Sequence, residues 1–73
     1  MGNRPLDILH TALNKRVVVE LRAGRSYRGT LDGYDHPHMN LVLKDAEEVQ
    51  HGNLVRKLSN VIVRGDAIVC ILP

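Results

Sequence analysis

The sequence contains no phenylalanine, no tryptophan and only one cysteine among its 73 residues. A single cysteine excludes an intramolecular disulfide, and the absence of large aromatic residues leaves an aliphatic core. A chain of this length buries only about 60% of its surface on folding, so a lone monomer is expected to be marginally stable. Small domains of this kind are usually supported by a metal or by other subunits. Either a bound metal or association with other subunits is therefore expected to stabilise the fold.

Long apolar runs are also missing. No run approaches the ~20 residues of a membrane-spanning helix, and residues 1–5 lack the apolar core of a signal peptide. Together with the single cysteine, these features predict a reducing, cytoplasmic location without a membrane partner. The formal net charge of +2 permits an acidic partner such as nucleic acid, but it does not indicate one by itself.

What is present predicts a mainly β domain spanning residues 1–73, with one short helix at its start. Pro5 suits a first helical turn, and Leu6, Leu9 and Leu13 recur at helical spacing, so the helix is predicted at residues 5–13. β-branched residues and two-residue alternation then predict strands at residues 17–22, 26–34, 39–43, 54–63 and 67–72. Residues 45–48 fit either a bulge or a continuation of the third strand. Five short antiparallel strands favour a small barrel of SH3 or OB type.

The last predicted strand is apolar on both of its faces. In a small barrel one face of such a strand normally meets water, and an uncovered apolar strand tends to pair with another chain. This pattern favours oligomerisation as the missing support. A metal is not expected, because Asp35, His36 and His38 supply too few ligands at a suitable spacing. No cofactor is expected, and no enzymatic activity either, because Cys70 lies within a strand and no other residue is set as a nucleophile.

Two segments resemble the motifs of the Sm/LSm family. Residues 29–43, GTLDGYDHPHMNLVL, resemble the first Sm motif, and residues 61–68, VIVRGDAI, resemble the second. Residues 4–7, RPLD, are similar to the start of the N-terminal helix in archaeal members. The resemblance implies the Sm fold, in which a helix lies on a strongly bent five-stranded antiparallel sheet. It also implies a homo-oligomeric ring, a heptamer or alternatively a hexamer, joined through the fourth strand of one subunit and the fifth of the next.

The same resemblance implies binding of U-rich single-stranded RNA at the ring's pore, in RNA processing or metabolism. Carried over to this sequence, the RNA site consists of His38, Met39, Asn40, Arg64, Gly65 and Asp66. The planes of His38 and Arg64 are expected to sandwich a uracil. Asn40 is expected to read its Watson–Crick edge, with Asp66 orienting Asn40 or Arg64. Gly65 is expected to turn the backbone tightly and to present an N–H to the base.

The first motif departs from the family pattern by one residue. The pattern usually has two residues between the aspartate and the Met-Asn pair, whereas His36, Pro37 and His38 stand here. Counting back from Met-Asn makes His38 the stacking residue and leaves His36 as an alternative. Three consequences of the extra residue are open from the sequence: a reshaped pore mouth, a shifted stacking position or a changed number of subunits.

A second RNA contact is expected at Arg4 and Tyr34, with His10 nearby, where a plain solvent-facing surface is the competing interpretation. Two other functions compete with RNA binding by a ring. One is a ring-forming protein-assembly module whose RNA binding is weakened by the altered loop. The other is an SH3-like monomer that acts in translation.

Overall fold

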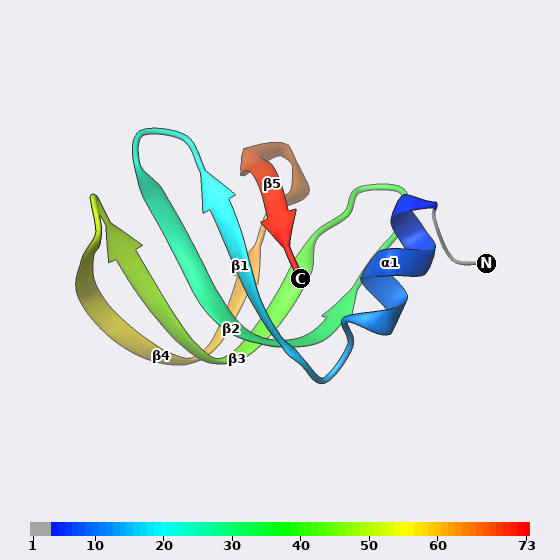
Figure 1. The fold of residues 1–73 in the computed structure, drawn as a ribbon, viewed down its shortest axis with the longest axis horizontal. Helices are drawn as coiled ribbons and strands as arrows, with labels where there is room; N and C mark the ends of the chain where they lie inside the picture. Colours follow the sequence, from blue (N-terminus) through cyan, green and yellow to red (C-terminus); the bar gives the residue numbers. More distant parts are fainter. Residues whose placement is uncertain (1–3) are drawn as a thin grey trace.

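The computed structural model describes residues 4–73, which form one helix, five strands and a short 3-10 helix (Figure 1). The elements are α1 (Pro5–Thr11), β1 (Arg16–Leu21), β2 (Arg25–Tyr34), β3 (Leu41–Gln50), β4 (Asn53–Val63), η1 (Gly65–Ala67) and β5 (Ile68–Leu72). Two predictions involve residues 1–3, which lie outside the described residues: that the single domain spans residues 1–73, and that residues 1–5 lack the apolar core of a signal peptide. No helix within residues 4–73 is long and apolar enough to cross a membrane.

The five strands form one antiparallel sheet in the order β4-β3-β2-β1-β5. This architecture confirms the predicted N-terminal helix and bent five-stranded antiparallel sheet. In Figure 1, α1 lies at one end of the sheet and the hairpin of β3 and β4 extends to the other end. Within residues 4–73 neither β4 nor β5 has a second neighbour in this order, so the sheet has two open edges.

Three boundaries differ by two residues or more from those predicted from the sequence, and the other strand ends agree to within one residue. The helix ends at Thr11 rather than at residue 13, and the chain reverses through Asn14, which has a φ of 66°. The third strand begins at Leu41 because Met39 has a φ of 59°, which is incompatible with a strand. It then continues to Gln50, so residues 45–48 belong to the strand, with a local irregularity at Asp45, whose φ is 48°.

The core is aliphatic, as the composition predicts. Its largest fully buried side chains are Leu31, Leu41, Leu43 and Val19. The helix contributes Leu9 and Ala12 to the same cluster. Gly29 is buried where β2 crosses β3, and a Cβ there would lie 3.0 Å from the Lys44 carbonyl oxygen. A glycine therefore allows the close strand approach that the bend of the sheet requires.

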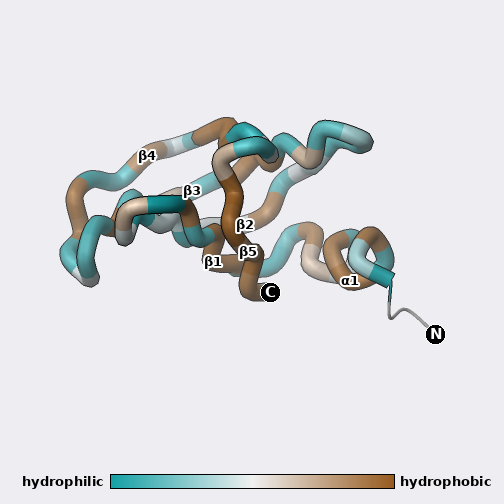
Figure 2. Tube along the Cα trace, turned by 90° about the horizontal axis from the view of Figure 1, so that it is seen from above, coloured by the Kyte–Doolittle hydropathy of each residue, from teal (hydrophilic) through white to brown (hydrophobic). Residues whose placement is uncertain are grey.

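The two open edges carry exposed apolar side chains. Ile62 on β4 is 72% exposed and Val69 on β5 is 63% exposed. Figure 2 shows β5 as hydrophobic along its length. An isolated chain would leave these side chains in water beside unpaired backbone groups, which is the surface that strand pairing with another copy would cover.

Candidate functional site

Two connections distant in sequence meet at one end of the sheet. The first is the loop of residues 35–40 between β2 and β3, and the second is the segment of residues 64–67 between β4 and β5. The backbone N–H of Gly65 donates a hydrogen bond to the side-chain oxygen Oδ1 of Asn40 at 2.9 Å. This bond joins the two segments that resemble the two Sm motifs.

Asp35 holds Asn40 at two points. Its Oδ1 accepts the backbone N–H of Asn40 at 3.1 Å, and its Oδ2 accepts the side-chain Nδ2–H at 3.0 Å. The loop is closed by two further bonds, from the Met39 N–H to the Asp35 carbonyl and from the Asp35 N–H to the Asn40 carbonyl. The extra loop residue is therefore accommodated without separating Asp35 from Asn40.

These contacts fix the direction of the Asn40 amide. An asparagine side chain has two N–H donors and an oxygen with two acceptor positions. Asp35 uses one N–H and Gly65 uses one position on the oxygen, so one donor and one acceptor remain. An amide with a free donor beside a free acceptor matches the edge of an unpaired nucleobase.

Gly65 is required by the closeness of the two segments. A Cβ on this residue would overlap the His38 carbonyl oxygen and would lie 2.9 Å from the Met39 carbonyl carbon, and both are backbone atoms. The predicted tight turn at this position is a 3-10 helix, η1. The Gly65 N–H is bonded to Asn40, which differs from the expectation that it faces the base.

A pocket of about 220 Å³ opens beside Asn40 and is lined by His38, Asn40, Ile62, Arg64 and Asp66. Four of the six predicted RNA-site residues thus line one pocket. Met39 instead packs against the core, and Gly65 is not a lining residue but is bonded through its N–H to Asn40. Arg64 Nη2 lies 2.9 Å from Asp66 Oδ2, so Asp66 contacts Arg64 rather than Asn40. His36 is exposed and is not among the lining residues.

Two residues of the site were not assigned a role from the sequence. Ile62 is apolar and therefore carries no chemical signal, but its spacing of two residues from Arg64 places both on one face of the chain at the end of β4. The sequence marks Asp35 only as a loop residue and as one of too few metal ligands. Asp35 stands five residues before Asn40, and only the closed turn between them brings its carboxylate to the Asn40 side chain.

The charges at the site favour an ionised Asp35. The side-chain N–H of Asn40, and next its backbone N–H, hold the pKa of the Asp35 carboxyl below its usual value. The carboxylate therefore remains an acceptor for Asn40 throughout the neutral range. Arg64 and Asp66 are largely exposed and form an ion pair at the pocket mouth, where the guanidinium plane is accessible.

The second predicted group is brought together in part. His10 Nδ1 lies 3.3 Å from the Tyr34 hydroxyl, and the two rings are in an edge-to-face arrangement with centroids 6.5 Å apart. Arg4 occupies the N-cap position of α1 without a side-chain cap bond, and its Nε lies 2.9 Å from Asp7 Oδ2. His10 and Tyr34 thus form one exposed aromatic pair, while Arg4 lies at the other end of the helix.

Comparisons with known proteins agree on one family. The model of the LSM domain matches residues 7–73. An snRNP Sm-like protein of Archaeoglobus fulgidus is 56% identical over 73 residues, which are 100% of this chain and 94% of that protein. An Sm protein of Pyrococcus abyssi, solved in complex with a uridine heptamer, has a TM-score of 0.92 at 45% identity and covers 97% of this chain and 99% of its own. The SmAP1 heptamer of P. aerophilum has a TM-score of 0.85 at 38% identity, over 94% and 90% of the two chains.

Proposed function

The chain belongs to the LSM domain family, and on that basis we propose that it forms a homo-oligomeric ring that binds U-rich single-stranded RNA at the pore, without catalysis. The observation that carries the proposal is the Asn40 amide, held by Asp35 and Gly65 with one donor and one acceptor free. The P. abyssi Sm protein with a bound uridine heptamer supports uridine as the nucleoside.

The pocket provides the contacts that an unpaired uracil needs. Uracil presents an N3–H donor beside carbonyl acceptors, which complements the acceptor and the donor that Asn40 has free. The His38 imidazole and the Arg64 guanidinium line the same pocket and offer planar groups for stacking. We therefore assign base reading to Asn40, stacking to His38 and Arg64, and orientation of Arg64 to Asp66.

The open edges of the sheet support ring assembly. β4 and β5 are both unpaired on one side, and each exposes a large apolar side chain there. Pairing β4 of one copy with β5 of the next is a head-to-tail contact, which closes into a ring when the rotation between copies allows it. We propose a heptamer, supported by the heptameric relative. Seven copies of a chain with net charge +2 would bring about +14 to the ring, which suits RNA.

The alternative of a protein-assembly ring with weak RNA binding depends on a loop disrupted by its extra residue. The Asp35–Asn40 bonds favour RNA binding, because the base-reading amide keeps its support. We further propose the His10–Tyr34 pair, together with Arg4, as a second contact for a base and a phosphate on the helix side. A cytoplasmic location remains a proposal from the sequence.

The test is a fluorescence anisotropy titration of labelled oligo(U) and oligo(C), with native mass spectrometry on the same preparation. We expect a mass seven times the 8.2 kDa of the chain and tighter binding of oligo(U) than of oligo(C). Phosphate attraction is strongest at low salt. Absence of oligo(U) binding at low salt, or equal binding of both oligonucleotides, would contradict the proposal.

A further inference from the structure

The two open edges of the sheet differ in length. β4 has eleven residues, whereas β5 has five and is followed directly by Pro73, which has no N–H to donate. The inference below rests on the ring of the proposed function, in which β5 of one copy pairs with β4 of the next. Since β5 can pair with at most five of the eleven residues, more than half of the β4 edge stays open in the assembled ring.

The apolar side chains indicate which part of β4 is covered. Ile62 and Val69 are the most exposed large apolar residues of the two edges. Pairing that brings them together places β5 of the neighbour against residues 59–63. Residues 53–58 then keep a free edge, and they lie in the hairpin that extends away from α1 (Figure 1).

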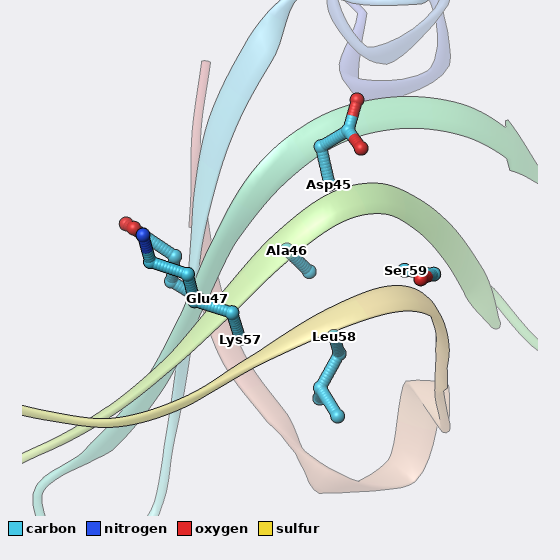
Figure 3. Close-up of a pocket in the computed structure, with 6 residues that line it drawn as sticks. All are labelled: Asp45, Ala46, Glu47, Lys57, Leu58 and Ser59. Atoms are coloured by element: carbon cyan, nitrogen blue, oxygen red, sulfur yellow. The ribbon is translucent and has the colours of Figure 1, made fainter.

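A row of alternating charges ends at this free edge. Arg28 on β2 lies opposite Glu47 on β3, with 2.6 Å between Nε and Oε1, and Glu47 lies opposite Lys57 on β4. Figure 3 shows the side chains of Glu47 and Lys57 extending to the same side of the hairpin. They line a hollow of about 380 Å³ that also includes Asp45 and Leu58. The charges across the three strands are therefore positive, negative and positive, and the last of them, Lys57, lies on the free edge of β4.

The adjacent row ends in the same way. Glu48 on β3 is only 6% exposed and is paired with Arg56 on β4, with 2.6 Å between Oε1 and Nε. Tyr27 on β2 lies opposite Glu48 on its other side. Successive residues of a strand point to opposite faces, so Arg56 and Lys57 place one cation on each face of the same free edge.

Apolar surface continues beside these two cations. Leu54 is 48% exposed and Val55 is 50% exposed. The chain's own β5, with the sequence IVCIL, has no carboxylate to set beside Arg56 or Lys57. A second copy's β5 therefore does not complement this part of β4.

We propose that residues 53–58 of β4 bind an extended acidic segment of a partner protein by strand addition. Backbone hydrogen bonds along the edge would provide the pairing. Two successive carboxylate side chains of the segment would lie beside Arg56 and Lys57, extending both charge rows by one anion. An apolar residue of the segment would cover Leu54. Cross-strand pairs of opposite charge and of apolar residues stabilise such a sheet.

The test uses the assembled ring and a short fluorescein-labelled peptide of valines and threonines with two successive central glutamates. We expect saturable binding by anisotropy. The Lys57→Glu variant should weaken it by about five- to tenfold, which is the effect of losing one cross-strand charge pair and gaining a repulsion. Lys15→Glu, which changes an exposed lysine outside the sheet, is the matched control. Arg56 is left unchanged because its replacement would leave the buried Glu48 carboxylate without its ion-pair partner.

A second peptide separates strand addition from simple charge attraction. Methylation of alternate backbone nitrogens removes donors that a new strand needs and keeps both glutamates. We expect this peptide not to bind, and equal binding of both peptides would overturn strand addition. If Lys57→Glu instead weakens oligo(U) and leaves the peptide unaffected, the edge contacts RNA and the inference is wrong.

The same samples separate this inference from the proposed function. A ring that binds oligo(U) but not the peptide would overturn strand addition alone, and Arg56 and Lys57 would then only guard the edge against aggregation. A mass of 8.2 kDa in native mass spectrometry would overturn the ring itself, whatever the peptide does.

Discussion

The Asp35 carboxylate binds Asn40 at both its backbone N–H and its side-chain N–H, at 3.1 and 3.0 Å. Because each carboxylate oxygen takes one of the two donors, the Asn40 amide cannot rotate without losing a hydrogen bond. Gly65 binds the other end of the amide. The protein alone thus orients the donor and the acceptor that the Asn40 amide has free, the two groups that we propose read the base.

Replacing Asp35 by alanine should release the Asn40 amide. Uracil and cytosine exchange a donor for an acceptor on the edge that Asn40 reads, so a freely rotating amide distinguishes them poorly. We expect the preference for oligo(U) over oligo(C) to fall by about tenfold, the effect of one well-oriented hydrogen bond. Anisotropy titrations of both oligonucleotides measure the ratio. An unchanged ratio in an intact ring would show that Asp35 does not position Asn40.

The loop offers two histidines, and the structure distinguishes them. His38 lines the pocket, whereas His36 is exposed outside it. Stacking of a base on a planar side chain contributes ~1–3 kcal/mol, so His38→Ala should weaken oligo(U) binding about tenfold or more. His36→Ala serves as the matched control and should change the affinity little. Equal losses in the two variants would contradict the assignment.

Adding a methyl group at Gly65 should disturb the site and the fold together. The new Cβ would overlap the His38 carbonyl, and the loop must shift to admit it. We expect Gly65→Ala to lower the free energy of unfolding by about 1–3 kcal/mol, as overpacking does, and to reduce oligo(U) affinity. Gly33→Ala is the control, because nothing lies within 4 Å of its added Cβ. Thermal melting and anisotropy of both variants provide the comparison.

Stability should decrease in acid. The pKa values of Asp35, Glu47 and Glu48 are lowered, chiefly by hydrogen bonds from Asn40, Arg28 and Arg56 respectively. A carboxyl whose pKa is lowered in the folded state stabilises the fold at pH values above its ordinary pKa, here 3.8 or 4.5. This contribution is lost as the pH falls through the lowered pKa. The melting temperature should therefore hold from neutral pH to near these values and then decline. Glu48→Gln should show a shallower acid decline, and an identical decline would exclude Glu48 as a contributor.

The exposed apolar side chain of β5 should be needed for assembly. Val69→Asp places a charge on the edge that would pair with β4 of the next copy. We expect native mass spectrometry to shift from the ring to the 8.2 kDa monomer. Ile8→Asp, an exposed apolar residue on α1, is the control and should keep the ring. A ring that survives Val69→Asp would exclude this edge from the interface.

Most of the fold could be predicted from the sequence, because alternation and turn residues define the strands locally. The start and the length of β3 could not. Met39 and Asp45 adopt positive φ values without being glycine, and such conformations depend on the contacts around them. Nothing in the sequence of residues 45–48 predicts burial, yet Glu48 is buried and paired with Arg56, which lies opposite it on β4 and eight residues away in the sequence.

The members of the pocket could be predicted only through the resemblance to a family. The spacing between Asn40 and Arg64 says nothing of their proximity until β3 and β4 are paired in register. Which group holds the Asn40 amide also depends on the loop geometry, so the expectation names Asp66 whereas the structure shows Asp35. The prediction that the Gly65 N–H faces the base was wrong for the same reason. This N–H bonds to Asn40, and a hydrogen bond between two loops distant in sequence leaves no pattern in the local sequence.

The bond between Gly65 and Asn40 has a thermodynamic consequence beyond the pocket. The chain between them is the β3–β4 hairpin, and a slip of one residue in its register would carry the two groups apart. RNA bound at the proposed Asn40 site would therefore select the correct register and stabilise it by mass action. In the proposed ring the next subunit docks on residues 59–63 of that hairpin, so RNA affinity and subunit affinity would be linked, and each would strengthen the other by the same factor.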